Sequence, residues 1–373
     1  MTLKPKNIRI YIISNMYPSA DDAYFGVFVK NFCDGIENSP QIEIVAKSVI
    51  KGQGKSFREK LQKYFLFYTS IIYNGFSKDF DIIYVHNVSH TILPLYIVLL
   101  RKIIKQFILI LNPHGEDMII THKLDGVLLN LSLPLIRSAD QIVSPSHYFK
   151  QKIVDLHQIN PKNIFVSASG GVNLEIFKPI NPITPKASDA KKIGYVSRME
   201  AEKGWDVLLH AVHQLIQNNE FKALEVFFIG KGDSTPDFQN LVDRLQLNNH
   251  IKYLGFKPQS ELPEFLNTLD AFIFPTKMYE SLGLVGLEAM ACGIPVIGSN
   301  RGGLTDYIKD GYNGFLFKCD DPTDLSEKII TYYHLNTKDI TEMKNNALRT
   351  AAEYSRKSIS DGMIKNLEEM IKK

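Results

Sequence analysis

The sequence predicts an α/β protein built of two Rossmann-like domains, each a doubly wound parallel sheet, that face each other across a cleft. Three observations support this prediction. A chain of 373 residues is longer than one hydrophobic core usually supports. Short β-branched segments alternate with helix-length segments, as in successive βαβ units. A proline-rich stretch at 177–192, FKPINPITPKASDAKK, divides the alternation into two series.

The strands of both series are predicted from their short apolar, β-branched composition. In the first half we expect strands at 8–14, 42–48, 81–87, 107–112, 141–146 and 163–169. After the proline-rich stretch we expect strands at 192–197, 225–230, 251–256, 271–276, 295–299 and 314–318. The pattern therefore predicts a first domain at 1–178, a linker at 179–191 and a second domain at 192–355.

The composition is that of an ordinary soluble globular protein, with 45% hydrophobic and 22% charged residues. Its three cysteines, Cys33, Cys292 and Cys319, lie far apart and form no CxxC pair, which favours a reducing compartment and argues against a disulfide framework or a zinc site. The first residues lead directly into a strand-like segment, so we expect no signal peptide and a cytoplasmic location.

The charge is distributed unevenly along the chain. Residues 1–180 contain 20 Lys/Arg and 14 Asp/Glu, whereas residues 181–373 contain 23 and 26. A basic first half favours a phosphate-bearing acceptor or a peripheral contact with the anionic inner face of the cell membrane, although a modest excess also serves solubility. The apolar run at 92–111 is broken by three basic residues, and it predicts a helix followed by a strand rather than a membrane span.

Candidate site residues follow the predicted strands, where ligands bind in doubly wound sheets. Arg198 follows the first strand of the second domain, and Lys203 precedes a helix expected at 205–215. Two cations beside a helix N-terminus would stabilise the charge that develops on a nucleotide diphosphate leaving group. The plain alternative is a pair of solvated surface charges.

Two glycines, Gly230 and Gly232, follow the next strand of the second domain. Without a Cβ, their backbone amides could approach a phosphate or a sugar closely. A simple tight turn between strand and helix is the alternative.

The segment from 275 to 299 carries the most information, because a strand, a loop with Glu280 and a short helix at about 284–292 follow one another. Glu288 lies inside the helix, so Glu280 and Glu288 cannot act as an adjacent acid/base pair. We expect Glu280 to bind hydroxyls of a donor sugar and Glu288 to bind a ribose diol. We expect the diphosphate at the amides of Gly283, Leu284 and Val285, and we include the preceding Ser281 and Leu282 in the donor-binding set.

These motifs together resemble the retaining glycosyltransferases of family 4. The runs SRMEAEKGWDVL, IGKG, PTKMYESLGLVGLEAMACGIPVIGSNRGGLTDYI and GYNGFLF agree with that family in order, spacing and residue types over about 130 consecutive residues. The first half is similar more loosely, in YPSADDAYFGVFVKNF, DIIYVHN, NPHGED and GGVNLEIFKP. One departure is the interdomain turn, where the common Asn-Gly-Val-Asp is replaced by residues 170–173, Gly-Gly-Val-Asn.

The resemblance implies the GT-B fold, with an acceptor-binding first domain, a nucleotide-sugar-binding second domain, and a final helix at about 356–373 that packs back on the first domain. It implies that Arg198 and Lys203 bind the donor diphosphate and that Gly26 offers an amide near the phosphates. It also places His114, otherwise a candidate structural histidine, beside the donor sugar and the acceptor. The family has no metal motif, so the pattern Asp79-Phe80-Asp81, which precedes a strand, is not expected to hold a metal.

The activity that the resemblance implies is transfer of a hexose, with retention, from a nucleotide diphosphate sugar to a glycan or lipid-linked glycan. A UDP-sugar is the favoured donor and a GDP-sugar the second choice, and the expected setting is cell-surface polysaccharide, lipopolysaccharide or capsule synthesis. We expect no cofactor, no essential metal and no nucleic-acid partner. Two alternatives stay open: a sugar-nucleotide epimerase of the same fold, and a catalytically silent protein that binds sugar nucleotides.

The segment at 55–76 predicts an amphipathic helix with basic residues at its start. Its predicted apolar face contains Phe57, Leu61, Tyr64 or Phe65, Tyr68 and Ile72. This face could pack on its own domain, or it could rest on an anionic membrane with the help of Arg58, Lys60 and Lys63.

Overall fold

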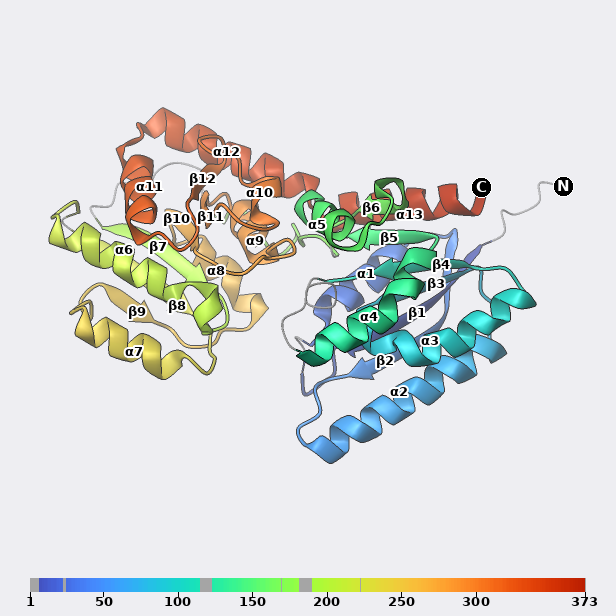
Figure 1. Cartoon of the computed structure of the whole chain (residues 1–373). Helices are drawn as coiled ribbons and strands as arrows, with labels where there is room; N and C mark the ends of the chain where they lie inside the picture. Colours follow the sequence, from blue (N-terminus) through green and yellow to red (C-terminus); the bar gives the residue numbers. More distant parts are fainter. Residues whose placement is uncertain are drawn as a thin grey trace. The chain divides into compact units, whose positions relative to one another are not determined.

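The computed structural model describes residues 7–22, 25–114, 123–168, 170–180, 190–221 and 223–372. The chain divides into two compact units (Figure 1). Unit 1 comprises Met1–Gly171 and Arg356–Lys373, and unit 2 comprises Val172–Ser355. This division precedes the predicted linker, most of which lies outside the described residues. The final helix α13 (Arg356–Lys372) belongs to unit 1, where it packs against α1 (Val27–Glu37).

Unit 1 contains a six-stranded parallel sheet in the order β2-β1-β3-β4-β5-β6. Its strands are β1 (Ile8–Tyr17), β2 (Ile42–Lys51), β3 (Ile82–His86), β4 (Ile108–Asn112), β5 (Gln141–Ser144) and β6 (Ile164–Val166). One face of the sheet is covered by α1 and α13. The other face is covered by α2 (Phe57–Ser77), η1 (Ser89–Thr91), α3 (Ile92–Leu99), η2 (Leu100–Ile103), α4 (Lys123–Ser138) and α5 (His147–His157).

Unit 2 contains a second six-stranded parallel sheet, in the order β12-β11-β10-β7-β8-β9. Its strands are β7 (Lys191–Val196), β8 (Leu224–Ile229), β9 (Ile251–Tyr253), β10 (Ala271–Phe274), β11 (Val296–Ser299) and β12 (Gly314–Phe317). Its helices include η4 (Ala201–Lys203), α6 (Trp205–Gln217), α7 (Thr235–Arg244), η5 (Gln259–Glu261), α8 (Leu262–Leu266), α9 (Leu284–Ala291), α10 (Leu304–Tyr307), α11 (Pro322–His334) and α12 (Thr337–Glu353).

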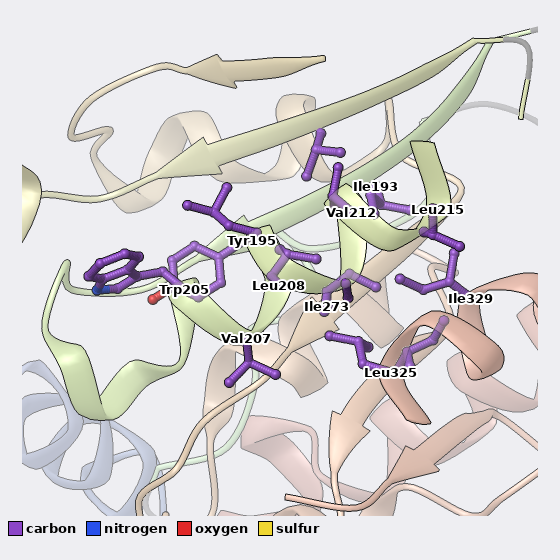
Figure 2. Close-up of a cluster of buried hydrophobic side chains, with 14 of the residues drawn as sticks. Ile193, Tyr195, Trp205, Val207, Leu208, Val212, Leu215, Ile273, Leu325 and Ile329 are labelled. Atoms are coloured by element: carbon purple, nitrogen blue, oxygen red, sulfur yellow. The ribbon is translucent and has the colours of Figure 1, made fainter. Parts of the chain in front are cut away.

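Each of the twelve predicted strands corresponds to one observed strand, which confirms the predicted doubly wound α/β architecture of both units. The core of unit 2 shows why the spacing of apolar residues predicted its elements. Figure 2 shows Leu208, Val212 and Leu215, spaced along one face of α6, packed between strand β7 and helix α11. Apolar residues at this helical spacing bury one stripe of the helix against the sheet.

Helix α2 corrects one prediction. The residues that it buries are Phe67, Ile71 and Gly75, with Tyr64 and Tyr68 partly buried beside them. Packing of the predicted face on its own domain was therefore wrong for Phe57 and Leu61, which are exposed. Of the two alternatives Tyr64 and Phe65, Tyr64 faces the core and Phe65 is exposed. The helix carries apolar residues on more than one side, and close packing on α3 selects the inward side: a Cβ on Gly75 would lie 2.5 Å from the Val98 side chain.

The apolar run at 92–111 forms α3, η2 and all of β4 except its last residue, Asn112. The predicted helix followed by a strand is therefore confirmed. No helix in the part of the chain that the structure describes is long and apolar enough to cross a membrane.

Candidate active site

The strand order of unit 2 creates a switch point between its two central strands. Strands β7 and β10 pair in parallel, but the chain leaves β7 toward β8 and leaves β10 toward β11, on the opposite side. The loops after these two strands therefore diverge and leave room for a ligand at the carboxyl edge of the sheet. The loop after β7 carries Arg198 and Lys203, and the loop after β10 carries Glu280.

The structure brings Lys203 and Glu280 together, although 77 residues separate them in sequence. The Nζ atom of Lys203 lies 2.7 Å from Oε1 of Glu280, and the two side chains are only 11% and 16% exposed. Glu280 Oε1 also accepts a hydrogen bond of 3.2 Å from the hydroxyl of Thr276. An ion pair this shielded from water costs more to break than a surface pair, so it holds both side chains in fixed positions.

Backbone contacts fix the two loops that carry this pair. Gly204 has φ 72°, and a Cβ there would overlap the carbonyl oxygen of Pro275 at the end of β10. The amide of Lys277 donates to the carbonyl of Glu202 over 2.8 Å. On the other side, the amide of Gly303 donates to the carbonyl of Glu280 over 2.7 Å. The Glu280 loop is thus held between the loop after β7 and the loop after β11.

Arg198 lies in the loop after β7, as predicted, but its guanidinium does not take part in the Lys203–Glu280 pair. Its side chain is 61% exposed, and Nη1 lies 2.7 Å from Glu200 Oε1 in the same loop. An exposed pair of this kind holds its geometry weakly. Arg198 is therefore available to turn toward an anion at the carboxyl edge.

The two predicted glycines have a packing role in this structure. Gly230 has φ 149°, and a Cβ there would overlap the carbonyl oxygen of Ser197. A Cβ on Gly232 would lie 2.5 Å from the carbonyl oxygen of Met199. The missing side chains let the loop after β8 lie directly against the loop that carries Arg198.

Helix α9 begins at the same edge, immediately after the Glu280 loop. Its N-cap is Gly283 with φ 85°, so the first helical amides belong to Leu284 and Val285, both of which are partly exposed. The first amides of a helix lack intrahelical acceptors and attract anions. Ser281 is partly exposed, whereas the side chain of Leu282 is buried, so Leu282 could meet a ligand only through its backbone.

Glu288 lies one turn further into α9 and has different partners from Glu280. Its Oε1 accepts a hydrogen bond of 2.5 Å from Nε2 of Gln259 in η5, and the residue is 9% exposed. The structure therefore gives the two predicted carboxylates separate hydrogen-bond partners.

Unit 1 has its own switch point, between β1 and β3, and its own polar cluster at the carboxyl edge. His86 ends β3, His114 follows β4, and their rings are joined by a 3.0 Å contact between Nδ1 of His86 and Nε2 of His114. Phe28 and Phe32 of α1 lie against this pair, with ring centroids 4.3 Å from His114 and 4.9 Å from His86.

This environment keeps both histidines neutral at pH 7. Burial lowers the pKa of His114 to about 3. Burial, together with the adjacent His114 ring, lowers the pKa of His86 well below its usual value. A neutral imidazole offers one donor and one acceptor, so the pair suits hydrogen bonding to hydroxyl groups rather than binding of an anion.

Gly26 lies at the N-cap of α1 with φ 69°, and a Cβ there would lie 2.5 Å from the backbone of Met16 at the end of β1. The structure thus places Gly26 at the carboxyl edge of the unit 1 sheet, together with His86 and His114. The rest of the NPHGED motif, residues 115–117, lies outside the described residues.

The Asp79-Phe80-Asp81 pattern lies at the opposite edge, before β3. Arg9 forms ion pairs with both aspartates, and Lys105 pairs with Asp79. Within the described ranges, no group of three His, Cys, Asp or Glu side chains is arranged to hold a metal ion.

The sequence prediction missed several residues that shape the unit 2 site. Thr276 bonds to Glu280, Lys277 anchors its loop, and Gly302 and Gly303 pack on its backbone. A local pattern could not identify Lys277, because its partners Asp206 and Asp320 lie in distant segments of the chain. Thr276 bonds to Glu280 four residues later, but its residue type alone did not mark it as part of the site. The glycine pair occurs in the run SNRGGLTDYI, whose resemblance to the family could have indicated it.

Comparison with known proteins relates the chain to glycosyltransferases. Residues 177–350, just under half of the chain, match the family described as "Glycosyl transferases group 1". An uncharacterized glycosyltransferase of Methanocaldococcus jannaschii is 31% identical over 222 residues, which are 59% of this chain and 57% of the relative. A D-inositol 3-phosphate glycosyltransferase of Streptosporangium roseum is 27% identical over 212 residues, 54% of this chain and 48% of the relative. The chain thus aligns with about half the length of these relatives.

A solved structure of similar fold covers nearly the whole chain. HepE of Anabaena, crystallised in complex with UDP, superposes with a TM-score of 0.75 over 97% of this chain and 100% of HepE, at 17% identity. At this identity the likeness establishes the fold, which is the GT-B fold.

Proposed function

We propose that this protein is a retaining glycosyltransferase, because residues 177–350 match the glycosyl transferases group 1 family and the chain has the GT-B fold. It transfers a hexose from a nucleotide diphosphate sugar, preferably a UDP-sugar, to a glycan or a lipid-linked glycan. The observation that carries the proposal is the shielded Lys203–Glu280 pair at the switch point of unit 2, beside the N-terminus of α9.

The donor diphosphate binds between Lys203 and the first amides of α9. Lys203 shares its charge between Glu280 and the phosphate oxygens, while the amides of Leu284 and Val285 add hydrogen bonds at the positive end of the helix. Arg198 leaves its exposed partner Glu200 for the diphosphate. Glu280, fixed by Lys203 and Thr276, accepts hydrogen bonds from sugar hydroxyls, and Glu288 accepts them from the ribose.

The reaction exchanges one bond at the anomeric carbon for another. The bond from this carbon to the diphosphate oxygen breaks, and a bond to the acceptor oxygen forms on the same face of the sugar. The acceptor proton passes to the departing diphosphate oxygen, so no protein base is required. Lys203 and Arg198 stabilise the growing negative charge on the diphosphate, which lowers the barrier selectively in the transition state.

Unit 1 contributes neutral hydrogen-bonding groups. We assign the partly exposed His114 to the hydroxyls of the transferred sugar or the acceptor, because an uncharged imidazole can form hydrogen bonds without attracting an anion. The buried His86 holds the His114 ring in position through their 3.0 Å contact. The UDP bound in HepE and the inositol phosphate in the name of the Streptosporangium roseum relative guide the choice of ligands to test. The proposed setting is synthesis of a cell-surface polysaccharide.

A panel of UDP-, GDP- and ADP-sugars tests the donor by thermal shift. A cognate donor at 100 times its dissociation constant adds about 2.7 kcal/mol to the free energy of unfolding. The stabilising donor is then incubated with glycan, lipid-linked glycan and inositol phosphate acceptors, and the anomeric configuration of the product is determined by proton NMR. We expect an α-linked product from an α-linked donor, formed equally well in the presence of a chelator.

Each alternative predicts a different result. An epimerase would convert the nucleotide sugar without an acceptor, and a silent binding protein would show the thermal shift without turnover. A β-linked product from an α-linked donor would contradict the retaining mechanism, even if transfer itself is observed.

A further inference from the structure

Unit 1 carries a broad exposed surface of apolar side chains that its own fold does not cover. We call it the α2–α4 surface. It contains fourteen of the twenty-two exposed large apolar side chains in the described part of the chain. They are Phe57, Leu61, Phe65, Leu66, Tyr73 and Phe76 of α2; Leu93, Tyr96 and Ile97 of α3; Leu100, Ile103 and Ile104 in and after η2; and Val127 and Leu131 of α4.

The three helices of this surface lie side by side on one face of the unit 1 sheet (Figure 1). Helix α3 contacts both α2 and α4, and the hydroxyl of Tyr96 donates to the carbonyl of Leu131 across the α3–α4 boundary. The inward sides of the helices share one core, so the exposed residues form their common outward side. Contiguous exposed apolar surface of this extent is unusual in a soluble monomer and marks an interaction site.

The most exposed part is the tip formed by Ile103 and Ile104, whose side chains are 84% and 85% exposed. Arg101, Lys102 and Lys105 flank this tip in sequence. Arg101 donates to the carbonyls of Gly75 and Lys78. Lys102 and Lys105 form ion pairs with Asp140 and Asp79. The tip thus presents two β-branched apolar side chains beside basic residues whose charged groups are bound by the protein itself.

The same region contains all the excess positive charge of the first half of the chain. Residues 51–105 include nine Lys/Arg and three Asp/Glu, whereas the remaining residues up to 180 include eleven of each. At the other end of the surface, the exposed residues Arg58 and Lys60 lie in the first turns of α2, beside the 80% exposed Phe57.

We propose that the α2–α4 surface is a docking face for an anionic phospholipid membrane. The apolar side chains enter the boundary between headgroups and acyl chains, and the cations meet the lipid phosphates. Tyr73 suits this position, because a tyrosine presents an apolar ring and a polar hydroxyl to a boundary of the same character. The inference is independent of the donor and of the chemistry proposed for unit 2.

The charge distribution favours a membrane over a second copy of the chain. A symmetric dimer through this surface would place its positive region against an identical positive region, and like charges in contact oppose association. An anionic bilayer instead complements the excess charge and covers the apolar side chains at the same time.

Vesicle co-sedimentation tests the proposal, with phosphatidylcholine vesicles that contain or lack phosphatidylglycerol. We expect the wild-type chain to bind only the anionic vesicles and to be released by salt. The double variant Ile103→Ser/Ile104→Ser and the double variant Arg58→Glu/Lys60→Glu should each bind at least tenfold more weakly. The second estimate follows from about fivefold per cation near an anionic surface. Lys63 is left intact, because it donates to the carbonyls of Lys51, Gly52 and Gln53.

Matched control variants test whether binding depends on this surface, rather than on exposed apolar residues or positive charge anywhere on the protein. Leu156→Ser/Ile371→Ser removes two exposed apolar residues elsewhere in unit 1, and Lys162→Glu/Lys338→Glu makes the same change of charge outside the surface. Both controls should bind like wild type. Thermal unfolding of every variant checks that the fold is intact.

Three results would overturn the proposal. One is the absence of salt-sensitive binding to anionic vesicles. Another is an equal loss of binding in the control variants. The third is a dimer, seen by light scattering in the absence of lipid, that the Ile103→Ser/Ile104→Ser change dissociates, since this would make the surface an interface between copies. Loss of donor binding would contradict the proposed function and leave this inference untouched.

Discussion

The carboxyl edges of the two sheets differ in the kind of polar group that they present. At the edge of unit 2, charged side chains come together: Lys203 pairs with Glu280, and α9 begins beside them. At the edge of unit 1, the central polar groups are two histidines in contact with aromatic rings and with each other. Both sheets place these groups at the carboxyl ends of central strands: β7 and β10 in unit 2, and β3 and β4 in unit 1. The two edges therefore differ mainly in their residues.

A diphosphate requires positive charge and free amides, whereas a sugar or an acceptor hydroxyl requires neutral donors and acceptors at fixed positions. We therefore propose that the two folds divide one reaction, with the diphosphate at the edge of unit 2 and a sugar or acceptor hydroxyl at the histidines of unit 1. The comparison predicts that substitutions in unit 2 affect charge stabilisation, whereas substitutions in unit 1 affect orientation and acid stability.

The largest expected effect is on turnover, in the charged pair of unit 2. Glu280→Gln and Lys203→Ala should each lower kcat/KM by about 10²-fold or more, since each removes a group that positions or stabilises the transition state. The measurement is initial rate with the donor and acceptor identified as above. Lys192→Ala is the control, because its pair with Glu225 lies at the opposite edge of the same sheet. Near-wild-type activity of either site variant would contradict the site assignment.

The next effect is on the stability of unit 2. Removing either Lys203 or Glu280 leaves its partner without a counter-charge in a shielded position, so each single variant should lose about 1–3 kcal/mol of unfolding free energy. The double variant should lose less than the sum of the two. Urea unfolding followed by the fluorescence of Trp205 reports on this unit directly, because it is the chain's one tryptophan and adjoins the site. Additive losses would show that the pair is not coupled.

A third effect distinguishes unit 1 by its response to acid. His86 and His114 have pKa values lowered in the folded state, so the unfolded chain takes up protons first as the pH falls below about 6.5. The stability that the two neutral histidines contribute is present above that pH and is lost toward pH 3. The free energy of unfolding falls by up to about 1.4 kcal/mol per pH unit for each histidine, and by less for the partly exposed His114.

Hydrogen exchange measures this effect strand by strand. Between pH 6.5 and pH 4.5, and after correction for intrinsic exchange, the protection of backbone amides against exchange should fall more in β3 and β4 than in β7 and β10. His114→Asn should reduce the pH dependence of unit 1, while the exposed His334→Asn should not change it. Equal losses in both sheets would show that the histidine pair does not determine acid stability.

The smallest effect concerns the anchor of the Glu280 loop. Lys277 pairs with Asp206 over 2.7 Å and with Asp320 over 3.1 Å, and its side chain is 27% exposed. Because partly exposed pairs contribute little, Lys277→Ala should lower stability by about 1 kcal/mol or less. Activity should fall only a few-fold. A loss of activity as large as that of Lys203→Ala would mean that Lys277 contacts the substrate itself.

Much of the fold could be predicted from local sequence. Each strand is a short β-branched segment, and its apolar residues are spaced differently from those of a helix such as α6. The alternation of strand-like and helix-like segments therefore predicted twelve strands in two sheets. The separation of Glu280 from Glu288 was also predictable, because one precedes a helix and the other lies inside it. Such features depend on residues close together in the chain.

The partners of the site residues could not be predicted in this way. Lys203 meets Glu280 because β7 and β10 are neighbours in the strand order, and no spacing within either loop encodes that order. The sequence left two explanations for Gly230, a nearby ligand or a tight turn between strand and helix. The fold adds a third, because the backbone of Ser197 in another loop occupies the place that a Cβ would need.

Helix α2 shows most clearly which features the local sequence determines and which depend on tertiary structure. Its sequence determined a helix of about the right length with basic residues at its start, because helical propensity and a serine N-cap are local properties. It did not determine which apolar side faces the core, because Phe57, Leu61 and Phe65 are as hydrophobic as the residues that are buried. Contact with α3 through Gly75 made that choice, since burial depends on which surfaces meet and not on how apolar each one is.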